Sequence, residues 1–206
     1  MNMKKKAAPL LAAALVAANA APVMAVDYQD VTGTQQTGNT TVVANVNATD
    51  SGNVTYTISV PSKVDFGDLQ RSADIAQRNN KELTGDVTLT TVDDLDTATQ
   101  RIAVLVQDAK NGTDGFRIYG VSGTASSNGK YLNYDILADG IELNNTNLTP
   151  YDNGFVVGAF AAEGNTVPLK FSLDQNQMTG ELDQWAGKYQ GTLTFYSKVA
   201  AVGDYN

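Results

Sequence analysis

Apolar side chains recur at every second position in several short runs of this chain, and no other feature restricts its fold as strongly. The clearest run places only apolar residues on one face and only hydroxyl-bearing residues on the other; its apolar face is Val54, Tyr56, Ile58 and Val60. Successive side chains of a strand point to opposite faces of a sheet, so this run predicts a strand with one buried face. Similar alternation occurs in residues 102–106, 116–118, 132–136, 167–173 and 189–199, with weaker candidates at 41–47, 86–92 and 155–160.

Turn-forming residues separate these runs. Asn111-Gly112, Asp114-Gly115 and Asn153-Gly154 are pairs that tolerate the positive φ angles of tight reversals. Eight or nine short strands with little helix predict an all-β fold, an antiparallel sandwich of immunoglobulin-like or Greek-key type. Pro168 has no N–H to donate, so its strand is predicted at a sheet edge or beside a bulge. One short helix is considered over residues 68–77.

The first 25 residues have the three parts of a secretory signal peptide. Lys4, Lys5 and Lys6 precede an apolar run that ends near Ala18, and a small-residue exit closes at Ala25. The apolar run is shorter than the roughly 20 residues that a membrane-spanning helix needs. We therefore expect cleavage after Ala25. The predicted organisation is a signal peptide at 1–25, a flexible N-terminal arm at 26–40 and one sandwich domain at 41–206.

Charge excludes two classes of partner. The whole chain has 14 basic and 22 acidic residues, and the leader takes three of the lysines and no acid. The mature chain thus keeps 11 basic against 22 acidic residues, a net charge of −11. Phosphate backbones and anionic membranes both attract basic surfaces, so we expect neither nucleic acid nor a membrane surface as a partner, and no membrane-spanning segment. The chain is expected to be secreted, or held at a cell surface without a covalent bond.

The residue types also argue against catalysis. Cys and His are both absent, which removes thiolate nucleophiles and the commonest general base and metal ligand. No pair of carboxylates is singled out by its spacing, so no catalytic residue and no cofactor is predicted. Asp93, Asp94 and Asp96 are the densest acidic cluster, and residues 108–115 are a second acidic loop, but neither follows a calcium-loop order, and both are interpreted as turns.

One aromatic residue is a candidate ligand contact. Trp185 is the single tryptophan and lies just before the last strand run. An exposed aromatic ring can stack on a sugar, as in a carbohydrate-binding module, whereas a ring that caps the core has no such role. The core-capping interpretation is favoured.

Two stretches resemble a known family. Val60-Pro61-Ser62-Lys63-Val64-Asp65-Phe66-Gly67 resembles the opening of WxL-type surface domains of Gram-positive bacteria, and residues 186–195 resemble the closing strand of that family. Between them, Phe116 and Ile118 stand where the family has its diagnostic Trp and Leu. The resemblance covers roughly residues 54–200 and implies a β-sandwich that binds the cell envelope. Gram-positive surface sandwiches can also carry Lys–Asn isopeptide bonds, which makes Lys198 the lysine to inspect.

The closing strand is also similar to that of fimbrial subunits. Such pilin-like subunits are incomplete sandwiches that accept a strand from a neighbour's N-terminal arm. In this chain residues 27–47 would be the donated arm, with Val42, Ala44 and Val46 as its inserted face. The sequence therefore predicts an exported, non-catalytic surface protein that acts in cell-envelope binding or adhesion. The alternatives are a self-assembling pilin-type subunit and a carbohydrate-binding module, with an envelope polymer or neighbouring subunits as partners.

Overall fold

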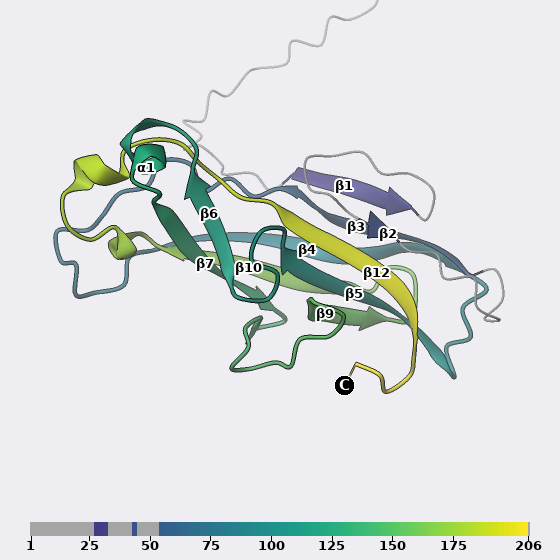
Figure 1. Ribbon diagram of the computed structural model, residues 1–206. Helices are drawn as coiled ribbons and strands as arrows, with labels where there is room; N and C mark the ends of the chain where they lie inside the picture. The colour runs from purple at the N-terminus through teal and green to yellow at the C-terminus, as the bar shows by residue number, and fades with distance from the viewer. Residues whose placement is uncertain (1–26, 33–42, 45–53, 206) are drawn as a thin grey trace, which may run out of the picture.

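The computed structural model describes the backbone of residues 27–32, 43–44 and 54–205, and the side chains of 54–205. The predicted signal peptide and most of the predicted arm lie outside the described residues. Within the described part the chain forms two stacked β-sheets with short helical turns at one end (Figure 1). The prediction of an all-β, antiparallel sandwich is confirmed.

The larger sheet has the strand order β1-β3-β4-β10-β7-β6-β11, with β8 paired to β7, and the smaller sheet has the order β2-β12-β5-β9. All pairs are antiparallel except β2 with β12, which run parallel. The strands of the described residues are β1 (Asp27–Thr32), β2 (Val43–Ala44), β3 (Thr55–Lys63), β4 (Asn80–Asp93), β5 (Gln100–Asp108), β6 (Phe116–Gly120), β7 (Tyr131–Ala138), β8 (Ile141–Glu142), β9 (Phe155–Phe160), β10 (Thr166–Asp174), β11 (Tyr189–Gln190) and β12 (Leu193–Ala201). The helical turns are α1 (Gly123–Ser127), η1 (Gln175–Gln177) and η2 (Leu182–Trp185).

The core lies between the two sheets and is made by the alternating apolar positions. The four residues of the predicted apolar face, Val54 just before β3 and three residues within it, are all buried, and the positions between them are not. The largest fully buried side chains come from both sheets: Phe155, Phe160, Phe171, Phe195, Ile58, Leu89, Ile102, Leu105, Leu132, Ile136, Leu169 and Leu173. Burying this apolar surface is the main driving force for folding in a chain that has no disulfide.

The strand β5 is buried on both faces, which alternation alone did not indicate. Ile102, Val104 and Val106 face the core, as predicted. On the opposite face Ala103 and Leu105 form a small second cluster, against which Tyr205 near the C-terminus packs. The end of the chain therefore covers part of the outer face of the smaller sheet.

The prediction for the strand with Pro168 is wrong, because β10 lies inside the larger sheet between β4 and β7. The carbonyl oxygen of Pro168 accepts a hydrogen bond from the N–H of Asp139, in the turn after β7, at 3.0 Å. The nitrogen of a strand residue points to the same side as its carbonyl. The missing N–H therefore faces Asp139, one residue beyond the end of β7, so the pairing of β10 with β7 begins only at Leu169 and the sheet tolerates the proline at this position.

The prediction of a short helix over residues 68–77 is also wrong. This segment is an irregular loop, and the short helix α1 lies elsewhere, after β6. The loop takes its shape from contacts with residues far away in the sequence, described below.

Candidate functional site

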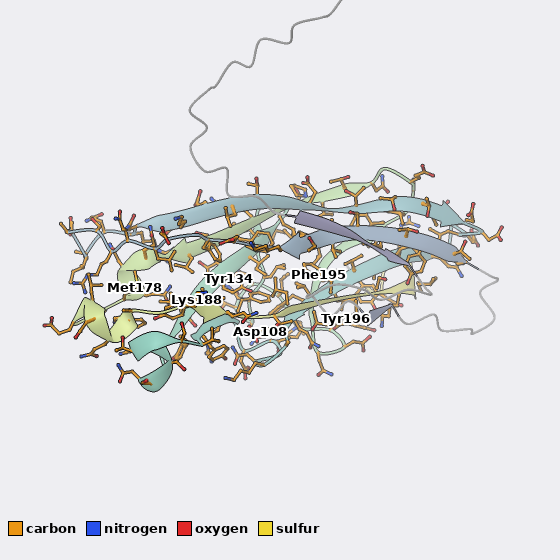
Figure 2. All side chains as sticks on the ribbon, turned by 90° about the horizontal axis from the view of Figure 1, so that it is seen from above. Asp108, Tyr134, Met178, Lys188, Phe195 and Tyr196 are labelled. Atoms are coloured by element: carbon orange, nitrogen blue, oxygen red, sulfur yellow. The ribbon has the colours of Figure 1, made fainter. Side chains whose placement is uncertain are left out.

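A groove opens along one side of the sandwich, with a volume of about 1490 Å³. Residues 61–71, at and after the end of β3, form one wall, and residues 185–193, through β11 to the start of β12, form the other. Figure 2 labels four residues of its lining, Tyr134, Met178, Lys188 and Phe195, which lie between the end of the sandwich that carries α1 and its middle. The two walls are the stretches that carried the family resemblance in the sequence, brought together by the fold.

The groove reaches down to the hydrophobic core. Phe66, Met178 and Leu193 line it and are buried, while Leu69 and Ile118 are half-buried and pack against the core. Leu182 and Val121 line it as well, and their exposed fractions are 47% and 51%. The groove therefore has an apolar part that stays partly exposed to solvent, beside charged residues such as Lys63, Asp65 and Arg71.

One border of the groove is a strand edge with few partners. Along one side β12 pairs with β5 over its whole length, from Leu193 to Ala201. Along its other side, the partner among the described residues is β2, which pairs only with Tyr196 and Ser197. Within the described part of the chain, the edge of β12 from Leu193 to Phe195 has no strand beside it. An unpaired strand edge is a template for strand addition.

The wall formed by residues 61–71 continues into a loop that two buried amides hold. Gln175 accepts a hydrogen bond from the N–H of Gln70 at 2.6 Å, and Asn176 accepts one from the N–H of Ser72 at 2.9 Å. Asn176 also donates its side-chain N–H to the carbonyl oxygens of Asp74, at 3.1 Å, and Gln77. Sequence reasoning missed these two residues, because their partners lie about a hundred positions away.

Trp185 lies at the end of η2, half-buried, in the lining of the groove. Its indole N–H donates to the carbonyl of Thr179 at 2.8 Å, and the ring packs against the core. The ammonium of Lys130 lies 4.5 Å from the ring centroid. A ligand contact by Trp185 stays a prediction, and its place in the groove makes it a probe for whatever enters there.

Both acidic loops adopt turns. Asp108 is 2% exposed, and its carboxylate accepts hydrogen bonds from the backbone N–H groups of Lys110 and Asn111, each at 2.8 Å, and of Arg117 at 3.0 Å. Asp96 accepts from the N–H of Ala98 at 3.0 Å and from the hydroxyl of Thr99 at 2.8 Å. In the described part of the chain, no group of three or more acidic side chains is arranged to hold a metal ion.

The buried Asp108 also acts on a neighbour in the core. Tyr134 lies deep in the sandwich, packed against Phe66 and Phe116. Burial, together with the negative charge of Asp108, raises the pKa of the Tyr134 hydroxyl far above its ordinary value. Tyr134 therefore stays neutral at any physiological pH and serves as a core residue.

Lys198 faces an aspartate and two tyrosines. Its ammonium donates to the carboxylate of Asp152 and lies 4.9 Å and 5.3 Å from the ring centroids of Tyr151 and Tyr205. Burial acts to lower the pKa of Lys198, but the hydrogen bonds to Asp152 and Tyr205 and their charges raise it above its ordinary value. The partner is therefore an aspartate in an ion pair and not the asparagine of a Lys–Asn bond; a covalent link at Lys198 stays a prediction that the intact mass would test.

No helix in the described residues is both long enough and apolar enough to cross a membrane. No protein-family model matches this sequence, and no curated protein matches it either. The resemblance to WxL-type domains therefore stays a prediction.

Among solved structures, the chain is similar to one chain of a structure described as "Chaperone-tip adhesin complex is vital for synergistic activation of CFA/I fimbriae biogenesis". The TM-score is 0.45 and the sequence identity 19%, and the match covers 74% of this chain and 43% of the other. This chain thus spans less than half the length of that protein. The comparisons assign it to no family.

Proposed function

We propose that this chain is a non-catalytic, exported β-sandwich subunit that assembles with copies of itself, the N-terminal arm of one copy entering the groove of the next. The observation that carries the proposal is the pairing of the arm. Its strand β1 pairs with β3, whose end begins one wall of the groove, and its strand β2 pairs with β12, which borders the other. The arm is thus complementary to both strand edges beside the groove.

Exchange of the arm between copies has a low energetic cost. When identical chains swap one element, the same contacts form between copies as within one copy. In addition, a strand beside Leu193 and Phe195 would satisfy backbone groups of β12 that have no strand partner among the described residues. It would also cover the apolar residues of the lining, such as Leu182 and Val121, and burial of their surface stabilises the assembled state. Of the predicted inserted face, Ala44 lies in β2, next to Ser197, and Val42 and Val46 lie outside the described residues.

The test is the assembly of the mature protein, residues 26–206, measured by light scattering after size exclusion and by electron microscopy. We expect polymers whose size grows with concentration and which vanish when residues 27–47 are deleted. A synthetic peptide of residues 27–47 should then bind the shortened protein and change the fluorescence of Trp185, the single tryptophan, in the groove wall.

Because the deletion could also weaken folding, a point variant provides a second test. Leu182→Glu puts a charge on an exposed residue of the groove and should reduce polymer formation at least tenfold. Ile75→Glu is the matched control: Ile75 is 58% exposed and lies outside the groove lining, so this change should leave assembly intact. A mature protein that stays monomeric at every concentration, or equal effects of the two variants, would refute the proposal.

A further inference from the structure

The outer face of the larger sheet carries a compact group of cations and tyrosines, the tyrosine–cation row, formed by Lys110, Arg117, Tyr119 and Tyr131. Tyr119 on β6 lies directly opposite Tyr131 on β7, and their ring centroids are 6.1 Å apart. The ammonium of Lys110 is 3.6 Å from the centroid of Tyr119, and the guanidinium carbon of Arg117 is 4.9 Å from that of Tyr131. Two cations therefore flank two neighbouring rings, which cation–π attraction holds in place.

Like most basic residues of the described part of the chain, these two cations belong to no ion pair with an acidic side chain. In the described part of the chain the ion pairs are Lys63–Asp65, Lys170–Glu82 and Lys198–Asp152. Neither Lys110 nor Arg117 belongs to one. Arg117 is oriented by neutral groups, chiefly the side-chain oxygen of Asn133 at 3.1 Å. In a protein with twice as many acids as bases in its mature part, two cations without carboxylate partners are available to an outside anion.

The row is preorganised by the turn that precedes β6. The carboxylate of Asp108 holds the backbone of both Lys110 and Arg117, so the two cations stand on one fixed frame. The hydroxyl of Tyr119 donates to the side-chain oxygen of Asn111 at 2.6 Å, which fixes this ring to the same turn. A ligand would lose little free energy in ordering these groups, because they are ordered before it binds.

We propose that the tyrosine–cation row binds an acidic glycan, with the carboxylate or sulfate groups of the sugar on Lys110 and Arg117. Tyrosine hydroxyls and ring edges, with the amides of Asn111 and Asn133 beside them, suit a ligand that is rich in hydroxyl groups as well as charged. Two cations are too few for a nucleic acid, whose binding depends on many phosphate contacts and would meet the negative charge of the rest of the chain. On β7 the next residue after Asn133 on the same face is Asp135, whose acidic side chain marks the end of the site in that direction.

The experiment is calorimetric titration of the mature protein with oligosaccharides of defined charge. The probes are oligogalacturonate for carboxylates, a sulfated heparin-type oligosaccharide for sulfates, and cello-oligosaccharide as the neutral sugar. We expect binding of at least one acidic probe, weaker at high salt because exposed charges are screened. No binding of the neutral probe is expected. Which acidic probe binds identifies the anionic group that is recognised.

Two variants and a matched control decide whether the row is the site. Lys110→Gln and Arg117→Gln should each weaken binding at least about tenfold, or 1.4 kcal/mol. Lys170→Gln removes the same charge from a residue of the larger sheet that is already paired with Glu82, and should leave binding unchanged. Leu182→Glu, in the groove, should also leave it unchanged, which separates this proposal from strand exchange. Absence of binding to both acidic probes, equal binding of the neutral one, or an equal loss in Lys170→Gln would refute the proposal.

Discussion

Two loops of this protein are shaped by buried polar side chains. In one loop the supporting side chain is charged (Asp108, the charged support), and in the other the supporting side chains are neutral amides (Gln175 and Asn176, the neutral support). The turn after β5 closes around a carboxylate, Asp108, and carries the tyrosine–cation row. The loop that continues the groove wall closes around the amides of Gln175 and Asn176. A carboxylate can only accept hydrogen bonds, whereas an amide both accepts and donates. Asp108 accordingly binds only N–H groups, while Asn176 binds the N–H of one residue and the carbonyls of two others.

The difference indicates what each loop requires. A tight turn directs several N–H groups inward, and one ionised acceptor satisfies them all with short, strong hydrogen bonds. A wide loop without secondary structure exposes both N–H and C=O groups to the interior, and both must find partners. The amides of η1 are the groups that can satisfy both at once.

Removal of the charged support should have the largest effect. Asp108→Ala leaves three partly buried backbone N–H groups without their acceptor, which should lower the free energy of unfolding by about 3 kcal/mol. Urea denaturation followed by Trp185 fluorescence measures this loss. Asp114→Ala, an exposed acid in the same turn, is the control and should change stability by less than about 0.5 kcal/mol. Similar losses in both variants would show that Asp108 is not the support of this turn.

Exchanging the chemistry of the neutral support should have a smaller effect that depends on pH. Asn176→Asp keeps the shape but replaces the donor by an oxygen that faces the carbonyls of Asp74 and Gln77. At pH 7 we expect a loss of about 2 kcal/mol in the free energy of unfolding. Burial and the facing carbonyls raise the folded-state pKa of the new carboxyl, so protonation at low pH restores a donor and part of the stability.

The control for this exchange is Asn176→Ala, which removes the amide without adding a titratable group. Its loss of stability, measured relative to the wild-type protein, should be the same at pH 4 and pH 7. Hydrogen exchange at the amide of Ser72 should accelerate in both variants. If the loss in Asn176→Asp were the same at both pH values, the donor role of Asn176 would be excluded.

The two supports also differ in how far the sequence predicts them. Strand patterns are local, so alternation in residues 54–60 sufficed to predict β3, and the Asn-Gly and Asp-Gly pairs sufficed to predict the turn after Asp108. Gln175 and Asn176 instead bind residues 105 and 104 positions away, and no local pattern indicates such contacts. The groove could not be predicted from the sequence for the same reason. Its two walls are separate stretches of the chain, and only the fold brings them together.

Removal of the charge of a further carboxylate, Asp135, should give the smallest effect, and it should raise stability where the two changes above lower it. Asp135 lies on β7 near Asp174, which accepts hydrogen bonds from the N–H groups of Asn79 and Asn176 beside the neutral support. Burial, followed by the charges of Glu142 and Asp174, raises the pKa of Asp135 in the folded protein, against the opposing charge of Arg78. A raised folded-state pKa means that the stability from this group is fully present below the ordinary Asp pKa of about 3.9 and is lost as the pH rises through the folded-state value.

Asp135→Asn should therefore raise the urea midpoint slightly at pH 7 and leave it unchanged near pH 3. Asp139→Asn, at an exposed position of the turn after β7, should change neither value. A gain in stability of Asp135→Asn that did not vary with pH would indicate improved packing. It would exclude relief of the repulsion between the charge of Asp135 and the neighbouring acids as the cause.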